Sequence, residues 1–220
     1  MDRSKLKSAA KRQIKGRLGI LFLINVIIGL ISVGATYILS LIPLVGTFAA
    51  AFVTAAFLLS SARVYLNLTT FQEPDVSDAF SGFDDILQAF LVQLLVGIFI
   101  FLWSLLFIIP GIIKSYSYSM SMYVLADYKG KSAIECINES KYLTDGHKMD
   151  LFILDLSFLG WDILSVFTLF ILNIWLTPYK LATRANAYRS LNPLTVTKEN
   201  THLEASVNSE TIETAEAPNN

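Results

Sequence analysis

LGILFLINVIIGLISVGATYILSLIPLVGTFAAAFVTAAFLLSSA, residues 18–62, contains no charged side chain. A helix that crosses a bilayer needs about 20 mostly apolar residues, so this stretch can hold two such helices. Pro43 lies near its middle. Proline lacks the amide proton of an uninterrupted helix and disfavours helical backbone at the preceding residue. The stretch therefore predicts a pair of antiparallel membrane helices that turns near Pro43.

Two later uncharged stretches repeat this arrangement. Pro110 and Gly111 lie within residues 86–113, and Pro178 lies within residues 163–179. The three prolines are almost evenly spaced, and we expect each to mark the turn of a helical hairpin. The predicted fold is an all-α polytopic transmembrane bundle of about six spans, built as three proline-broken hairpins, each preceded by a cytoplasmic amphipathic helix.

Composition also indicates an integral membrane protein. Of the 220 residues, 54% are apolar and 16% are charged, whereas a soluble domain averages about 25% charged residues. The basic N-terminus and the apolar run after it resemble a signal peptide. However, the run from Leu18 to Ile42 is longer than the roughly 7–15 apolar residues of such a peptide. We interpret it as an uncleaved first span.

The sequence is expected to divide into a membrane domain and a tail. Residues 1–191 would form the integral membrane helical domain, in three repeat-like units of about 1–66, 75–127 and 131–191. Residues 192–220 are polar, acidic and free of aromatic side chains. That composition is typical of disordered segments, so we expect a disordered acidic cytoplasmic tail.

The first unit begins with a basic helix. Leu6, Ala10 and Ile14 recur every four residues among lysines and arginines, which is typical of an amphipathic helix at an anionic lipid surface. A plain basic flank that orients the first span is the alternative. Residues 1–18 contain seven Lys or Arg and one acid, so the positive-inside rule predicts that both termini and the amphipathic segments are cytoplasmic.

Local signals also describe the later units. Ser132 and Glu135 have the spacing of a capping box, and Gly146 is suited to end a helix. The Ser/Tyr/Met alternation of residues 115–122 would suggest a strand in a soluble protein. A lone strand in lipid leaves its backbone unpaired, so we expect a helix over about 112–126.

Small side chains recur every four residues in the predicted second span, at Ala51 and Ala55 and at Ala56 and Ser60. Such spacing lets helix backbones approach closely in lipid. Packing within the chain and dimerisation both explain it, and we favour packing within the chain.

Ionisable residues inside the third hairpin suggest matched pairs. With a turn near residues 172–173, Asp162 is level with Arg184, and Asp155 is roughly level with Arg189. Lys180 lies on the same helical face as Arg184. The last helix, residues 174–191, is expected either to span the bilayer or to lie at its surface, because charge inside a membrane is costly.

The first two hairpins suggest further pairs at matched depth. Asn25 is level with Arg63, and Gln93 is level with Asp127. Two interpretations compete for all these polar groups: a substrate or proton path, or interhelical pairs that fix the register of the helices. Because each group has a partner within the chain, we favour the structural interpretation.

Motifs for catalysis, cofactors or metals are absent from the sequence. Asp145, His147 and Asp150 could form an acid/base site, but we interpret His147 as a surface or capping residue. The basic N-terminus lacks an aromatic platform, so nucleic acid is not expected as a partner. The partners that we expect are anionic membrane lipids at the N-terminal basic helix, other membrane proteins or a second copy of the chain.

The third unit carries motifs of a known family. They resemble the bacterial integral-membrane family designated domain of unknown function 975, and the resemblance covers about Leu6 to Leu191. It implies a bacterial plasma-membrane protein and no particular activity. Residues 169–173 depart from the pattern, since similar proteins often have glycine at this turn. The motifs are PGI (110–112), YVLAD (123–127), AIE (133–135), GHK (146–148), DLF (150–152), LDLSF (154–158), GW (160–161), WLTPY (175–179) and ANAY (185–188).

Together these features predict a non-enzymatic membrane scaffold or partner-binding subunit. The alternative is a small-molecule transporter or permease component that uses the intramembrane cluster of Asp155, Asp162, Lys180, Arg184 and Arg189.

Overall fold

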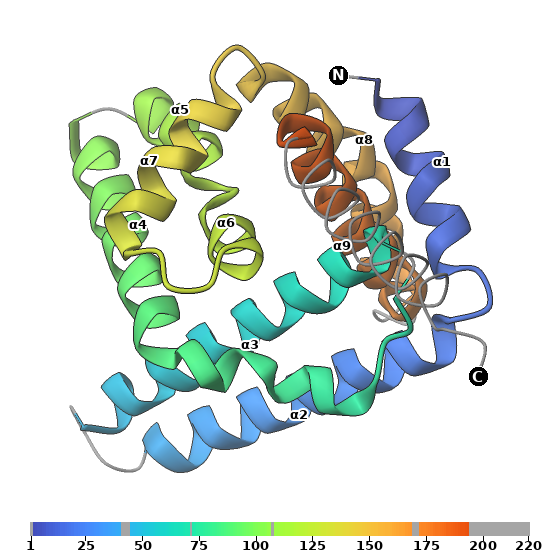
Figure 1. The fold of residues 1–220 in the computed structure, drawn as a ribbon, viewed down its shortest axis with the longest axis horizontal. Coiled ribbons are helices and arrows are strands. Elements are labelled where there is room, and N and C mark those ends of the chain that lie inside the picture. Colours follow the sequence, from blue (N-terminus) through green and yellow to red (C-terminus); the bar gives the residue numbers. More distant parts are fainter. Residues whose placement is uncertain (1, 41–44, 71, 107, 169–171, 194–220) are drawn as a thin grey trace, which may run out of the picture.

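The computed structural model describes residues 2–40, 45–70, 72–106, 108–168 and 172–193, and these residues contain helices and no strand (Figure 1). The predicted all-α class is therefore confirmed. The elements are α1 (Arg3–Ile14), α2 (Leu18–Ser40), α3 (Val45–Thr69), the 3₁₀ helix η1 (Val76–Asp85), α4 (Ile86–Leu106), α5 (Ile108–Tyr118), α6 (Ser121–Asp127), α7 (Ala133–Thr144), α8 (Lys148–Phe167) and α9 (Asn173–Leu191).

Within the described residues, three helical segments are long and apolar enough to cross a membrane: Leu18–Ile38, Phe48–Thr69 and Val76–Leu105. In an apolar 18-residue window of each segment, 11% of the first and of the third is buried within the protein, against 56% of the second. Continuous exposed apolar surface of this extent is unfavourable in water and suited to hydrocarbon. The chain therefore has the character of a membrane protein, with α3 as its central helix.

The three units pack in a closed ring. Each has a short leading helix (α1, η1 or α7), an outgoing helix (α2, α4 or α8) and a returning part (α3, α5–α6 or α9). Helix η1 packs on α3, α7 on α6, and α1 on α9. Each leading helix thus rests on the returning part of the preceding unit, and α1 closes the ring on the last one (Figure 1).

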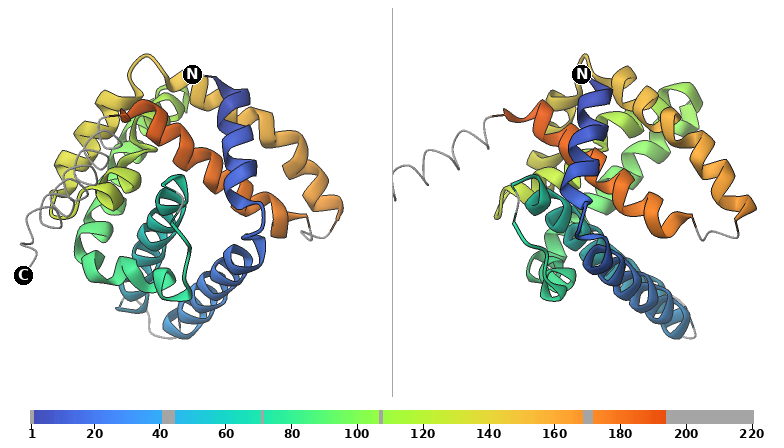
Figure 2. Two further views of the ribbon diagram at one scale, coloured as in Figure 1. Left: turned by 45° about the vertical axis from the view of Figure 1, so that its right-hand side comes forward. Right: turned by 90° about the vertical axis from the view of Figure 1, so that its right-hand side faces the viewer.

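The helix pairs run in different directions. Figure 1 shows the α2–α3 pair at a steep angle to the α8–α9 pair, although both pairs reach toward the same side of the molecule in the right-hand view of Figure 2.

Capping residues define the ends of two leading helices, and those of α7 were predicted from the sequence. Asp2 caps α1 with its side chain, and Ser132 with Glu135 forms a complete capping box at α7. Gly16 and Gly146 follow α1 and α7 with φ of +86° and +74°, a backbone conformation that glycine adopts without steric cost. The predicted roles of Ser132, Glu135 and Gly146 are confirmed.

The helix predicted over 112–126 is interrupted, because α5 ends at Tyr118 and α6 begins at Ser121. Ser140 of α7 lies at the break. Its hydroxyl donates to the Ser117 carbonyl at 2.8 Å and accepts from the Met120 amide at 3.2 Å. A side chain from the next unit therefore satisfies backbone groups that an unbroken helix would have paired.

One of the prolines predicted to mark a turn lies inside a helix, and another lies directly after a connection. Pro110 and Gly111 lie in the first turn of α5, just after the connection from α4, where a missing amide proton costs little. Pro178 lies inside α9, so its prediction as a turn residue is wrong. Pro43 and the predicted acidic tail after Pro193 lie outside the described residues.

Helix α3 packs within the chain through its small residues. Ala55, Ala56 and Ser60 are fully buried. The backbone of Gly82 in η1 approaches so closely that a Cβ there would lie 2.0 Å from the Ala56 carbonyl oxygen, and its amide donates to the Ser60 hydroxyl at 2.9 Å. The stripe thus serves contacts within the chain, as we favoured from the sequence.

Candidate functional site

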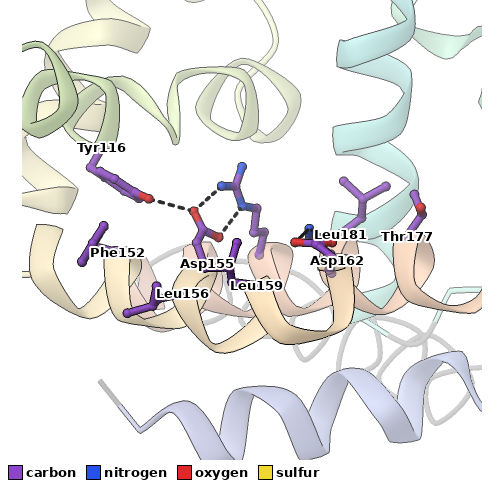
Figure 3. Close-up of a pocket in the computed structure, with 10 residues that line it drawn as sticks. Tyr116, Phe152, Asp155, Leu156, Leu159, Asp162, Thr177 and Leu181 are labelled. Carbon is purple, nitrogen blue, oxygen red and sulfur yellow. Dashed lines mark hydrogen bonds and ion pairs between the residues drawn. The ribbon is translucent and has the colours of Figure 1, made fainter. Parts of the chain in front are cut away.

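Helices α5, α8 and α9 border a cavity of about 540 Å³ that contains two ion pairs (Figure 3). Four of the ionisable residues singled out from the sequence line it: Asp155, Asp162, Lys180 and Arg184. Its apolar part includes Phe152, Leu156, Leu159 and Leu181. The cavity is therefore amphiphilic, with balanced charge along one side.

The inner ion pair joins all three helices. Asp155 of α8 accepts hydrogen bonds from Arg184 of α9, at 2.6 Å from Nη2 and 3.3 Å from Nε. The Tyr116 hydroxyl of α5 donates to the same carboxylate at 3.2 Å, as Figure 3 shows. Two-point contact between a guanidinium and a carboxylate fixes both position and orientation. This pair can thus set the register of α8 against α9.

The outer pair lies two helical turns further along α8. Both carboxylate oxygens of Asp162 are 2.9 Å from Lys180 Nζ. The side chains of Asp162 and Lys180 are 39% and 35% exposed, and the Asp155 side chain is 27% exposed. Each acid in the cavity therefore has a cation of its own, and the two pairs together are neutral.

The partners differ from those predicted. The sequence matched Asp162 with Arg184 and Asp155 with Arg189, but the structure pairs Asp162 with Lys180 and Asp155 with Arg184. The prediction placed each partner about one helical turn too far along α9. The predicted partners depend on the residue at which the hairpin is assumed to turn. If that residue is placed slightly too late in the chain, every predicted partner on α9 is also too late.

Arg189 belongs to a different cluster. Its Nη1 is 2.8 Å from Asp127 at the end of α6, and its Nε donates to the Thr69 hydroxyl of α3 at 3.2 Å. The Tyr188 hydroxyl also donates to Asp127, at 2.9 Å. We call this set, Thr69, Asp127, Tyr188 and Arg189, the hub. It joins the ends of α3, α6 and α9, the returning helices of all three units.

The hub was missed from the sequence because its members are far apart in the chain. The feature that its residues share in the sequence is that each lies near the end of a returning helix. The Arg189 and Asp127 side chains are only 13% and 8% exposed. A buried ion pair that joins three helices is expected to make a large difference to stability when one partner is removed.

The pairs predicted in the first two hairpins are wrong. Asn25 donates to the Tyr65 hydroxyl at 2.6 Å, and Arg63 forms an ion pair with Asp85 of η1. The Gln93 side-chain oxygen is buried and accepts no hydrogen bond from the described residues. The arginine therefore links its helix to the next leading helix rather than to its own outgoing helix.

Comparison with known proteins identifies the family and no activity. The model of the family described as "Protein of unknown function (DUF975)" matches residues 1–117 and 105–195. No curated protein and no solved structure matches the chain. The two matched segments together cover every helix described above. The chain therefore belongs to the DUF975 family of proteins of unknown function.

Proposed function

We propose that this protein is a non-enzymatic scaffold or partner-binding subunit of the bacterial plasma membrane. Its three hairpins would insert from the cytoplasmic side, with both termini in the cytoplasm. The excess of lysine and arginine before the first apolar stretch supports this topology.

The observation that carries the proposal is the pairing inside the cavity. Asp155 is matched by Arg184, and Asp162 by Lys180. A site that takes a charged substrate at membrane depth needs a charge that the substrate can complement. Here every cavity charge already has a counter-charge, an arrangement suited to holding α8 and α9 in register while their outer faces remain available to a partner.

A carrier of small molecules is the second candidate, and the cavity itself favours it. The space of about 540 Å³ adjoins both ion pairs, and that volume is within the range of small-molecule sites. In this function the pairs would open to admit a zwitterionic or amphiphilic molecule, with Lys180 and Arg184 binding its anionic end.

Exchange of the charges of the outer pair tests these alternatives. Asp162→Lys and Lys180→Asp would be made singly and together, with the same exchange at the more exposed Asp145–Lys148 pair as a control. The full chain would be purified in native lipid discs, and co-purified proteins, lipids and metabolites identified by mass spectrometry.

A scaffold predicts that each single change lowers the folded yield, that the double exchange restores it, and that the co-purified proteins are retained. A carrier predicts that the double exchange folds but loses a metabolite that the unmodified chain retains. That second result, with the control exchange unaffected, would contradict the scaffold proposal.

A further inference from the structure

A second groove, distinct from the ion-paired cavity, lies between α1 and the α8–α9 pair. Its volume is about 540 Å³. We call it the lysine groove. One wall carries Lys7, Lys11 and Lys15, and the other carries Trp161, Trp175 and Tyr179.

Two of the lysines lie on one face of a helix that is held in place. Lys7 and Lys11 are four residues apart in α1, and Lys15 directly follows the helix with extended backbone. The adjacent face of α1 buries Leu6 and Ala10. Gln13 and Asn186 of α9 exchange side-chain hydrogen bonds of 2.6 and 3.2 Å. Lys7 and Lys11 are therefore fixed in position relative to α9.

No acid among the described residues pairs with the lysines of the groove. Within the described residues, Lys11 and Lys15 form no ion pair, and Lys7 Nζ lies 4.2 Å from the centre of the Phe158 ring rather than beside an acid. Partial burial and the neighbouring Arg3 both lower the pKa of Lys7. A bound anion would relieve this uncompensated positive potential.

The other wall is aromatic and open. Trp161 is 53% exposed and Trp175 is 59% exposed. Leu164, Phe167 and Ile174, on the same two helices, are also exposed. Half-exposed tryptophan beside a row of lysine is typical of the level where a membrane protein meets lipid headgroups.

We propose that the lysine groove binds one anionic phospholipid, whose phosphate contacts Lys7, Lys11 and Lys15 while an acyl chain lies along Trp161 and Trp175. A free phosphate would leave the aromatic wall exposed to water. This wall offers an acidic peptide few polar partners, namely the two indole N–H groups and the Tyr179 hydroxyl. The inference goes beyond the proposed function and holds for a scaffold and for a carrier.

Lipid-dependent fluorescence quenching tests the proposal. The chain has three tryptophans, so Trp103→Phe leaves only the two that line the groove. The full chain would be placed in phosphatidylcholine discs containing a small fraction of lipid brominated on the acyl chain, either phosphatidylglycerol or phosphatidylcholine. We expect brominated phosphatidylglycerol to quench the tryptophan fluorescence at a lipid fraction at least roughly ten-fold lower than brominated phosphatidylcholine requires. The reason is that each lysine attracts anionic lipid.

Two variants with the same change of charge make the test specific. Lys7→Gln, Lys11→Gln and Lys15→Gln together should remove the preference for phosphatidylglycerol. Arg3→Gln, Lys5→Gln and Arg12→Gln together, on the same helix but outside the groove lining, should retain it. Thermal unfolding in detergent would confirm that both variants are folded.

Three results would overturn the proposal. Equal loss of preference in both variants would show general surface attraction. Displacement of the brominated lipid by soluble glycerol phosphate would show an anion site without a lipid chain. An absence of quenching in a protein that is dimeric in the discs would show that a second copy fills the groove.

Discussion

The α2–α3 pair and the α8–α9 pair, which correspond to the first and third predicted hairpins, are held together by different contacts. Helix α3 of the first is more than half buried, and its small residues let the η1 backbone approach to contact. Helices α8 and α9 of the third are joined by two ion pairs and border an open cavity. Without a hydrophobic force between helices in lipid, close backbone packing and polar pairs are the main ways to fix an interface.

The difference indicates that the first unit has mainly a structural role and that the third unit carries the cavities. The first hairpin supplies the rigid centre, since η1, α2, α4, α6 and α9 all pack on α3. The third hairpin carries the charged cavity and one wall of the lysine groove. Binding functions are therefore expected in the third unit, and substitutions in the first should act mainly on stability.

The largest effect is expected at the hub. Arg189→Met leaves the Asp127 carboxylate buried without its cation, so the free energy of unfolding in mixed micelles should fall by about 3 kcal/mol or more. Arg12→Met, at an exposed position on α1, is the control and should change it by less than about 0.5 kcal/mol.

A second variant distinguishes loss of the ion pair from a general folding defect. Asp127→Leu combined with Arg189→Met replaces the pair with apolar groups and should recover most of the lost stability. If the double variant is no more stable than Arg189→Met alone, the ion pair is not what joins the returning helices.

A smaller effect is expected where η1 meets α3. Gly82→Ala puts a methyl group against the Ala56 carbonyl, which should lower stability by roughly 1–3 kcal/mol. Gly97→Ala is the matched control, because a Cβ at that position of α4 has nothing within 4 Å. Equal stability of the two variants would show that α3 and η1 are not in close contact.

The smallest effect concerns closure of the ring. Gln13→Ala removes the reciprocal amide contact with Asn186 and should cost about 1 kcal/mol. It should also increase protease cleavage near α1. Gln72→Ala, at an exposed position, is the control. If the two variants are cleaved equally, α1 is not held on α9.

The sequence predicted what is local and missed what joins distant segments. Capping at Ser132 and the helix end at Gly146 depend on a few neighbouring residues, so their patterns were decisive. The break between α5 and α6 depends on Ser140, which comes from the next unit. Nothing within residues 112–126 alone could reveal it.

The candidate site shows the same limit of local patterns. The sequence correctly grouped four residues, because an unpaired charge within an apolar hairpin is costly. They are Asp155, Asp162, Lys180 and Arg184. Their exact partners depended on where the turn begins. Arg189 was assigned to the wrong cluster because its partner, Asp127, belongs to another unit.

Orientation of the first hairpin is the most direct test of the central claim that all three hairpins insert from one cytoplasmic surface. The native Cys136 is unsuitable for labelling, since it is fully buried and burial raises its pKa to about 11. In a Cys136→Ala background, Asn138→Cys on the exposed side of α7 and Ile38→Cys, where the native side chain is 65% exposed near the end of α2, are the test positions.

An impermeant thiol reagent applied to intact cells should label Ile38→Cys and leave Asn138→Cys unlabelled, and inside-out vesicles should reverse the two results. Labelling of both positions from the same side would contradict the account, because α2 would then lie along the membrane surface instead of crossing it.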